Sequence, residues 1–393
     1  MLRLRLLFLL FGAALGAFYP FVPVILADRG FGPAEIGATT AAASVAFSLA
    51  VPAWSHLADV VVGRVGALRL AATGCAFALV GFGLPWPPAV LAALYVGFIV
   101  FESAIGPLAD ALAVNALADP PRQYGRIRLL SSIAFAAVSV AVGVLYDETS
   151  YWPSSLICAG LALAIVPVSA GLADRPRFEL RRSSAGSDDG PEPRRRGGSM
   201  RYAFASAPGL LEVALAIGLA FGGVIAGFTY LGLRIVELGG RPSDVALSAA
   251  VAAFAEIPGM AAASVIAPRF GLRTLFGGAA LLYGVSFAVW IVATDVGIII
   301  ASRALTGLAF AGLWIGSVLA MRALLPDRLQ GTGQGIFQVA AFGVGALVAN
   351  GVGGIIYGLV GHRLLFGLAA ASAATGALVG WRALPGPRRA AGR

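Results

Sequence analysis

Charged and metal-binding residues are scarce in this sequence of 393 residues. Only 12% of the residues are Asp, Glu, Lys or Arg, against roughly 25% in ordinary soluble domains, and none of them is Lys. The chain has two histidines, His56 and His362, and two cysteines, Cys75 and Cys158, both of which fall inside apolar runs. This inventory predicts no disulfide framework and no multi-histidine metal centre. We therefore expect neither a metal nor a cofactor.

Apolar residues, by contrast, make up 59% of the chain, and its mean hydropathy is +0.88. A soluble fold cannot bury so much apolar surface, which disfavours a soluble enzyme, a nucleic-acid binder and a disordered chain alike. The net charge of +9 does not point to a nucleic acid either, because the Arg residues lie between long apolar runs, where they set membrane topology. The expected surroundings are therefore a lipid bilayer.

Membrane-spanning helices need about 20 mostly apolar residues each, and twelve such runs follow one another along the chain. They cover residues 6–27, 34–57, 67–84, 90–113, 129–145, 152–172, 209–233, 245–267, 275–293, 297–322, 335–359 and 364–384. The first run follows Arg3 and Arg5 as the apolar part of a signal peptide would, but it continues to Ala27 and is too long to be a removable signal. The sequence thus predicts an all-α integral membrane protein with twelve transmembrane helices.

The longest polar segment, residues 174–207, separates the first six runs from the last six. It is rich in Arg, Ser, Pro and Gly, which is typical of a solvated linker. We therefore divide the chain into residues 1–173, a cytosolic linker at 174–207 and residues 208–393. With the N-terminus in the cytosol, 23 Arg lie on the cytosolic side and 4 on the outer side, so both termini are predicted to be cytosolic. This topology predicts a multi-pass protein of the cytoplasmic membrane.

The two halves share a weak internal repeat. The second run opens on PAEIG at residues 33–37, and the eighth opens on PSDVA at residues 242–246, which is 209 residues later. At the same spacing, Arg64 after the second run corresponds to Arg273 after the eighth. Repeats related by an axis along the membrane normal produce this pattern, so we expect two pseudo-symmetric six-helix bundles.

Three ionisable residues lie well inside predicted membrane helices, where a charge costs at least about 2.5–3.5 kcal/mol. Glu102 and Glu256 occupy the middle of the fourth and eighth runs, and Arg303 lies within the tenth. Each Glu fits either a proton carrier, because burial favours a neutral carboxyl group, or a structural hydrogen bond, for Glu102 with a nearby Ser or with Arg303. Arg303 fits either an anion-binding role or a side chain that reaches out to the interface. We predict proton coupling at the two Glu residues and substrate binding at Arg303.

Other side chains are candidates for the substrate site and for a cytosolic gate. Aromatic residues inside membrane helices either line a cavity or pack and anchor the helix. Those that we name as possible substrate contacts, together with one polar residue, are Tyr19, Tyr230, Trp314 and Gln338. Charged residues at the cytosolic ends of the second, fourth and fifth runs form the predicted gate, which consists of Asp59, Arg64, Asp110, Arg126 and Arg128. Ion pairs among them would hold the cytosolic side closed.

Short motifs resemble those of the major facilitator superfamily of secondary transporters. The loop HLADVVVGR at residues 56–64 resembles the superfamily's signature loop, although Ser55 replaces a usual Gly and one extra residue separates Asp59 from Gly63. Further stretches resemble the branch that holds the phenylpropionate permease, the nucleoside–proton symporters and lactose permease. These stretches are GPLADAL at 106–112, YGRIR at 124–128, AEIP at 255–258, LTGLAF at 305–310 and GQG at 333–335. That branch usually has Gly-Ser where this chain has Ser131 and Ser132.

This resemblance implies a transporter that works by alternating access, with a site near the membrane midplane between the two halves. The branch points to uptake of an aromatic or other organic carboxylate with protons, and we expect a monomer whose partners are this small molecule and protons. Proton-antiport efflux of drugs or metabolites fits the same embedded carboxylates. An integral-membrane enzyme or a sensor fits less well, because the sequence has no catalytic cluster near a membrane face and no folded output domain. ATP-driven transport would need a phosphate-binding loop, which the sequence lacks.

Overall fold

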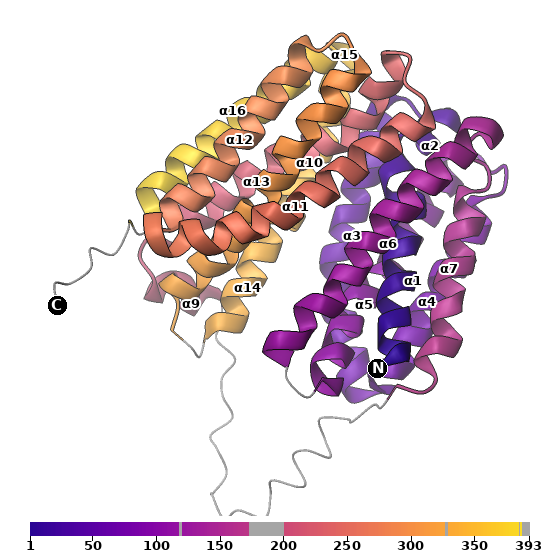
Figure 1. Cartoon of the computed structure of the whole chain (residues 1–393), viewed down its shortest axis with the longest axis horizontal. Coiled ribbons are helices and arrows are strands. Elements are labelled where there is room, and N and C mark those ends of the chain that lie inside the picture. The colour runs from indigo at the N-terminus through magenta and orange to yellow at the C-terminus, as the bar shows by residue number, and fades with distance from the viewer. Residues whose placement is uncertain (118–119, 173–199, 327–328, 385, 387–393) are drawn as a thin grey trace, which may run out of the picture. The chain divides into compact units, whose positions relative to one another are not determined.

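The computed structural model describes residues 1–117, 120–172, 200–326, 329–384 and 386. All regular secondary structure in this part of the chain is helical (Figure 1). The helices form two compact units, of which one comprises Met1–Gly30 and Val45–Arg194, and the other comprises Phe31–Ser44 and Arg195–Arg393. Helix α3 (Pro33–Val60) therefore contributes its beginning to the second unit and its remainder to the first.

The first unit is built around α1 and α4. Its helices, besides the remainder of α3, are α1 (Leu2–Phe18), η1 (Tyr19–Phe21), α2 (Val22–Asp28), α4 (Gly63–Phe82), α5 (Pro88–Ala116), α6 (Pro120–Thr149) and α7 (Ser154–Ser169). Helix α1 packs against α6 and α7, and α4 packs against α5 and α7. Pro20 and Pro23 have no amide hydrogen to donate, so the α-helical ladder is interrupted after α1 by the 3₁₀ turn η1. Tyr19 lies at this interruption.

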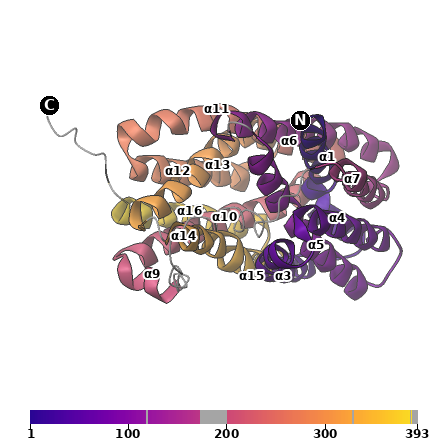
Figure 2. The ribbon, with the colours of Figure 1, turned by 90° about the horizontal axis from the view of Figure 1, so that it is seen from below.

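The second unit contains, besides the beginning of α3, α9 (Met200–Ser206), α10 (Leu210–Glu237), α11 (Pro242–Phe270), α12 (Leu272–Val292), α13 (Val296–Leu324), α14 (Gln330–Gln338), η3 (Val339–Gly345), α15 (Ala346–Leu359) and α16 (His362–Ala383). Helix α13 packs between α11 and α12, and α16 packs between α10 and α12 (Figure 2). The run from α14 to α15 is continuous, but its middle segment η3 is π-helical. A π-helical segment inside an α-helix is rare and often marks a functional site.

Eleven of the predicted membrane runs coincide with the eleven helical segments of the described residues that are long and apolar enough to cross a membrane. The remaining run, residues 152–172, forms α7, which has 16 residues. A helix of that length extends about 24 Å, somewhat less than the roughly 30 Å hydrocarbon core of a bilayer. Most of the predicted linker, residues 174–199, lies outside the described residues. Its end is helical instead of irregular, because α9 packs on α10 and α14 and buries Ala203.

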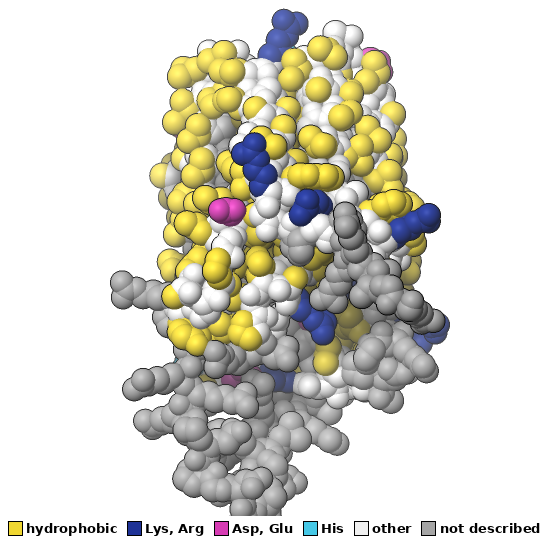
Figure 3. All heavy atoms as spheres, turned by 90° about the vertical axis from the view of Figure 1, so that its left-hand side faces the viewer, with side chains coloured by type: hydrophobic (Ala, Val, Ile, Leu, Met, Phe, Trp, Pro, Cys, Tyr) yellow, Lys and Arg dark blue, Asp and Glu magenta, His cyan; other side chains and the backbone are white. Residues whose placement is uncertain are grey.

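Apolar side chains make up much of the described surface on the face that Figure 3 shows. Phe77, Val292 and Leu359, for example, are between 73% and 82% exposed. Exposed apolar surface on this scale would drive a soluble protein to aggregate. The same surface is stable in contact with lipid chains, which agrees with a multi-pass membrane protein.

Helices α1 and α6 approach each other closely because Gly12 has no side chain. A Cβ atom at this position would overlap the backbone carbonyl oxygen of Ser131 on α6. Gly160 on α7 is a matched contrast, because a Cβ atom there would meet nothing within 4 Å.

We expect Gly12→Ala to destabilise the protein by about 1–3 kcal/mol, because the added methyl group forces α1 and α6 apart. In detergent this variant should melt several degrees below the wild type. Gly160→Ala should melt at the same temperature or slightly higher, because Ala is a better helix former than Gly. Equal melting temperatures for the two variants would contradict the described contact between α1 and α6.

Candidate functional site

Among the described residues, each unit holds a cluster of side chains around one of the ionisable residues that the sequence singles out inside membrane helices. In the first unit, the hydroxyl group of Tyr19 donates a hydrogen bond of 3.0 Å to Oε2 of Glu102 on α5. Glu102 is half-buried, and Tyr19 is 36% exposed. The hydrogen-bond partner of Glu102 is therefore neither of the two that the sequence suggested, a Ser or Arg303.

Glu102 lines a small cavity whose other walls are apolar residues and two cysteines. These residues include Phe11, Cys75, Phe98, Ile105, Cys158 and Ile165. The two thiol groups are buried and free, and they donate to the backbone carbonyl oxygens of Phe98 and Ala14. Among the described residues, no Arg or His side chain lies within 4.0 Å of the Glu102 carboxylate, and the ion pairs there involve other residues. A charge on Glu102 is thus supported by one phenol and by no cation.

The cluster of the second unit is centred on Arg303 of α13, which is only 7% exposed. Its Nε donates to the carbonyl oxygen of Ser248 at 3.2 Å, and its Nη1 donates to Oγ1 of Thr306 at 2.8 Å. The guanidinium carbon lies 4.2 Å from the centre of the Phe228 ring, close enough for a cation–π interaction. Arg303 is therefore held inside the unit and does not reach outward to an interface.

Two further ionisable residues belong to this cluster. Tyr283 of α12 is fully buried, and its ring centre lies 5.9 Å from that of Phe228. Its hydroxyl group is buried without a hydrogen-bond partner among the described residues. Glu256 of α11 is half-buried and lies within electrostatic range of both Arg303 and Tyr283. The structure thus brings Glu256 and Arg303 together and adds Tyr283 and Phe228, neither of which the sequence distinguishes from other aromatic residues of apolar runs.

The other candidate substrate contacts lie apart from these clusters, and two of them, Tyr230 and Trp314, pack against other aromatic rings. Tyr230 is buried, stacks on Tyr357 at 5.3 Å and donates to the carbonyl oxygen of Asn350 at 2.8 Å. Trp314 packs on a group of phenylalanine rings with centre distances of 5.1–6.4 Å, which are Phe221, Phe310, Phe337 and Phe342. Gln338 is exposed at the end of α14, next to the π-helical segment. In this conformation Tyr230 and Trp314 act as packing residues.

The residues of the predicted gate form two separate ion pairs in the first unit. Nη2 of Arg64 lies 3.6 Å from Oδ1 of Asp59, and Nε of Arg128 lies 4.0 Å from Oδ1 of Asp110. Arg126 is exposed and makes no ion pair with the described residues. Asp59 and Arg64 also line a cavity of about 130 Å³ between α3 and α5. Partly exposed pairs of this kind contribute about 0–1 kcal/mol each, so either can open at little cost.

Comparison with known proteins places the chain among membrane transporters. The model of the family described as "MFS_1 like family" matches residues 1–368. The maltose permease of Geobacillus stearothermophilus is 29% identical over 345 residues, which cover 87% of this chain and 84% of that protein. A probable 3-phenylpropionic acid transporter of Escherichia coli (strain K12) is 31% identical over 164 residues, 42% of each chain.

Solved structures show the same fold at low sequence identity. The nucleoside transporter NupG superposes with a TM-score of 0.81 and 15% identity, covering 97% of this chain and 98% of that one. A D-xylose–proton symporter superposes with a TM-score of 0.72 and 15% identity, covering 98% and 97% of the two chains.

Proposed function

This chain belongs to the MFS_1 like family of the major facilitator superfamily, and from that premise we propose that it is a proton-coupled symporter for a small organic carboxylate. Its relatives are membrane transporters, so it is a transporter and not an enzyme. The proposal includes twelve spans with α7 as the sixth, two six-helix bundles, and alternating access to a site between them. It also includes a monomer in the cytoplasmic membrane with both termini in the cytosol.

The observation that carries proton coupling is the isolation of Glu102. A carboxylate inside a membrane helix is costly unless a cation or several hydrogen bonds support it, and among the described residues Tyr19 is the hydrogen-bond donor to Glu102. Such a group can load a proton and release it when its surroundings change. Glu256 is a second carrier candidate, but it already lies within electrostatic range of Arg303.

Tyr19 is well placed to control the protonation of Glu102. The phenol donates to the carboxylate from a 3₁₀ turn that interrupts the first helical run, and more than a third of its surface is exposed. A donated hydrogen bond favours the charged form of a carboxyl group. We infer that movement of the η1 turn withdraws this bond and lets Glu102 take up a proton.

Tyr19→Phe tests this role, because it removes the hydroxyl group and keeps the ring beside Phe98. Without its donor Glu102 should hold a proton to higher pH, which moves the alkaline limb of the uptake profile upward by about one pH unit. The measurement is initial uptake rate against pH in proteoliposomes. An unchanged pH profile with a lower maximal rate would reduce Tyr19 to a packing residue.

The substrate class is inferred from Arg303. Two of its nitrogen atoms are engaged, but Nη2 donates to none of the described residues, and the Tyr283 hydroxyl is also without a partner there. The unused Nη2 of Arg303 and the Tyr283 hydroxyl, which lies within electrostatic range of Arg303, suit a carboxylate, because a carboxylate accepts several charge-assisted hydrogen bonds. One relative is named as a probable 3-phenylpropionic acid transporter, which is consistent with this class. A saccharide is the second candidate, because the relative with the longest stretch of similarity given above is named a maltose permease.

The proposal is tested by uptake into proteoliposomes whose interior is more alkaline than the medium. We expect accumulation of radiolabelled 3-phenylpropionate, abolished by a protonophore, and no accumulation of maltose or a nucleoside. Weak acids also enter such vesicles unaided, so the signal is the difference from protein-free vesicles with the same gradient. Accumulation driven only by an acidic interior would instead indicate proton-antiport efflux, and accumulation of maltose alone would indicate a sugar permease.

A further inference from the structure

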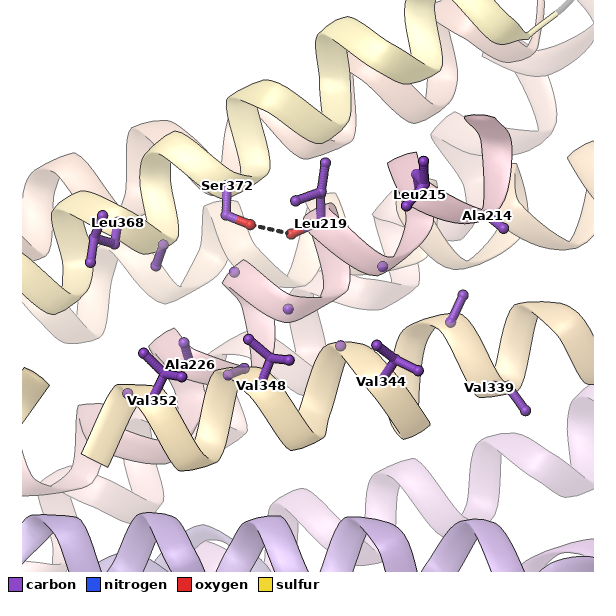
Figure 4. Close-up of a pocket in the computed structure, with 18 of the residues that line it drawn as sticks. Ala214, Leu215, Leu219, Ala226, Val339, Val344, Val348, Val352, Leu368 and Ser372 are labelled. Carbon is purple, nitrogen blue, oxygen red and sulfur yellow. Dashed lines mark hydrogen bonds between the residues drawn. The ribbon is translucent and has the colours of Figure 1, made fainter. Parts of the chain in front are cut away.

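An apolar groove of about 470 Å³ runs along the second unit between α10, the run from η3 to α15, and α16. We call it the α10–α15–α16 groove; side chains along it include Leu215, Leu219, Val344, Val348, Leu368 and Ser372 (Figure 4). Its lining also includes Gly218 and Gly222 of α10 and Gly345 of η3. Because these positions have no side chains, the surface is hollowed where α10 and η3 meet.

The groove offers a ligand almost no polar surface. Ser372 is the one residue with a polar side chain among those that line it, and its hydroxyl group already donates to the carbonyl oxygen of Leu219 at 2.7 Å (Figure 4). A carboxylate, a sugar or a nucleoside would lose its hydrogen bonds with water there and gain few in exchange. The groove is therefore unsuited to the solutes considered for the transport site.

The groove is open at the surface of the second unit. Val344, Val348 and Leu215 along it are 60%, 55% and 54% exposed. The helices that carry them are long and apolar enough to cross a membrane. On α10 the lining residues extend from Leu211 to Ala226, which corresponds to about 22 Å along the helix axis. That length exceeds the roughly 15 Å of hydrocarbon in one leaflet, so the groove is long enough for an extended hydrocarbon chain.

We propose that the α10–α15–α16 groove binds an acyl chain of a membrane phospholipid. Lipid tails are as apolar as the groove, so the hydrophobic effect does not favour the groove over the bilayer, and binding depends on van der Waals packing. A chain in the groove contacts walls on three sides, whereas a chain on a convex helix surface contacts one. It also packs directly on the π-helical segment η3, which forms part of one wall.

The test uses the full-length protein in phosphatidylcholine vesicles that contain a phosphatidylcholine with a photoreactive diazirine in the middle of one acyl chain. After irradiation, peptide mass spectrometry locates the adducts. We expect a several-fold higher yield at Val344, Val348 and Leu368 than at Leu281 and Val285. The latter two are 53% exposed on membrane helix α12 but do not line the groove.

Filling variants make the test specific. Ala349→Trp on α15 and Ala214→Trp on α10 should each lower the adduct yield in the groove several-fold. Ala371→Trp is the matched control on exposed surface of α16 outside the groove and should leave that yield unchanged.

Equal labelling of the groove and α12, or labelling that both filling variants leave unchanged, would overturn the proposal. Cross-linked dimers in place of lipid adducts would overturn it too, because they would show a second copy of the chain in the groove. The readout is independent of transport, so it stands or falls separately from the proposed function.

Discussion

Replacing Glu102 by Gln should abolish proton-driven accumulation of substrate while exchange of labelled for unlabelled substrate continues. Gln has nearly the same shape and can still accept the hydrogen bond from Tyr19, but it carries no proton across the membrane. Exchange requires only that the loaded protein changes conformation, so it does not depend on release of the proton. The measurement compares accumulation and counterflow in the same proteoliposome preparation, with binding of substrate as a check on folding.

Glu256→Gln is the matched variant. Like Glu102, Glu256 is a half-buried carboxyl group near the middle of a membrane helix, but it belongs to the second unit. If Glu102 is the carrier, this variant should change substrate affinity through Arg303 more than it changes the accumulation ratio. Full accumulation by Glu102→Gln together with loss of accumulation in Glu256→Gln would move the coupling role to Glu256.

Replacing Arg303 by Met should weaken binding of carboxylate substrates by about ten- to a hundredfold, since hydrogen bonds to a charged group contribute about 1.5–3 kcal/mol. Affinity for a neutral ligand should change little, because the neutral ligand makes no ion pair with the guanidinium group. Met fills the buried space beside Phe228 without a charge, which limits damage to packing. Competition binding with 3-phenylpropionate and its amide measures the difference directly.

Tyr283→Phe separates ligand binding from stability in the same cluster. The hydroxyl group that it removes has no partner among the described residues, so its loss should not lower the melting temperature. If the hydroxyl group contacts the substrate, affinity for the carboxylate should fall several-fold at unchanged stability. If Arg303→Met weakened the binding of 3-phenylpropionate and of its amide equally, the carboxylate assignment would be contradicted and the saccharide would be the better candidate.

The membrane runs were predictable from sequence because hydropathy is a local property of the chain. The stretches 6–27 and 335–359, for instance, coincide with continuous helical runs of the structure. The interruptions inside them were not predicted. The π-helical segment η3 arises from a change in backbone hydrogen-bond register, and residues of ordinary apolar composition form it.

The candidate site was predicted as separate residues but not as contacts. Glu102 and Arg303 stand out in sequence because charges are rare in membrane helices. The partner of Glu102, Tyr19, is 83 residues away and meets it only because η1 and α5 belong to the same packed unit. Tyr283 was missed, since a buried hydroxyl without a partner leaves no trace in the sequence. The choice between an interfacial and a buried Arg303 likewise depends on α11 and α12, which supply Ser248 and Tyr283 around it.

Proton movement during substrate entry tests the central claim most directly. Proteoliposomes in a weakly buffered medium at uniform pH receive 3-phenylpropionate, and a pH electrode follows the medium against protein-free vesicles. The account predicts a transient rise in external pH that tracks substrate entry in the wild type and is absent in Glu102→Gln. Substrate entry without any change in external pH beyond that of protein-free vesicles, or a fall in external pH, would contradict symport of a carboxylate with a proton.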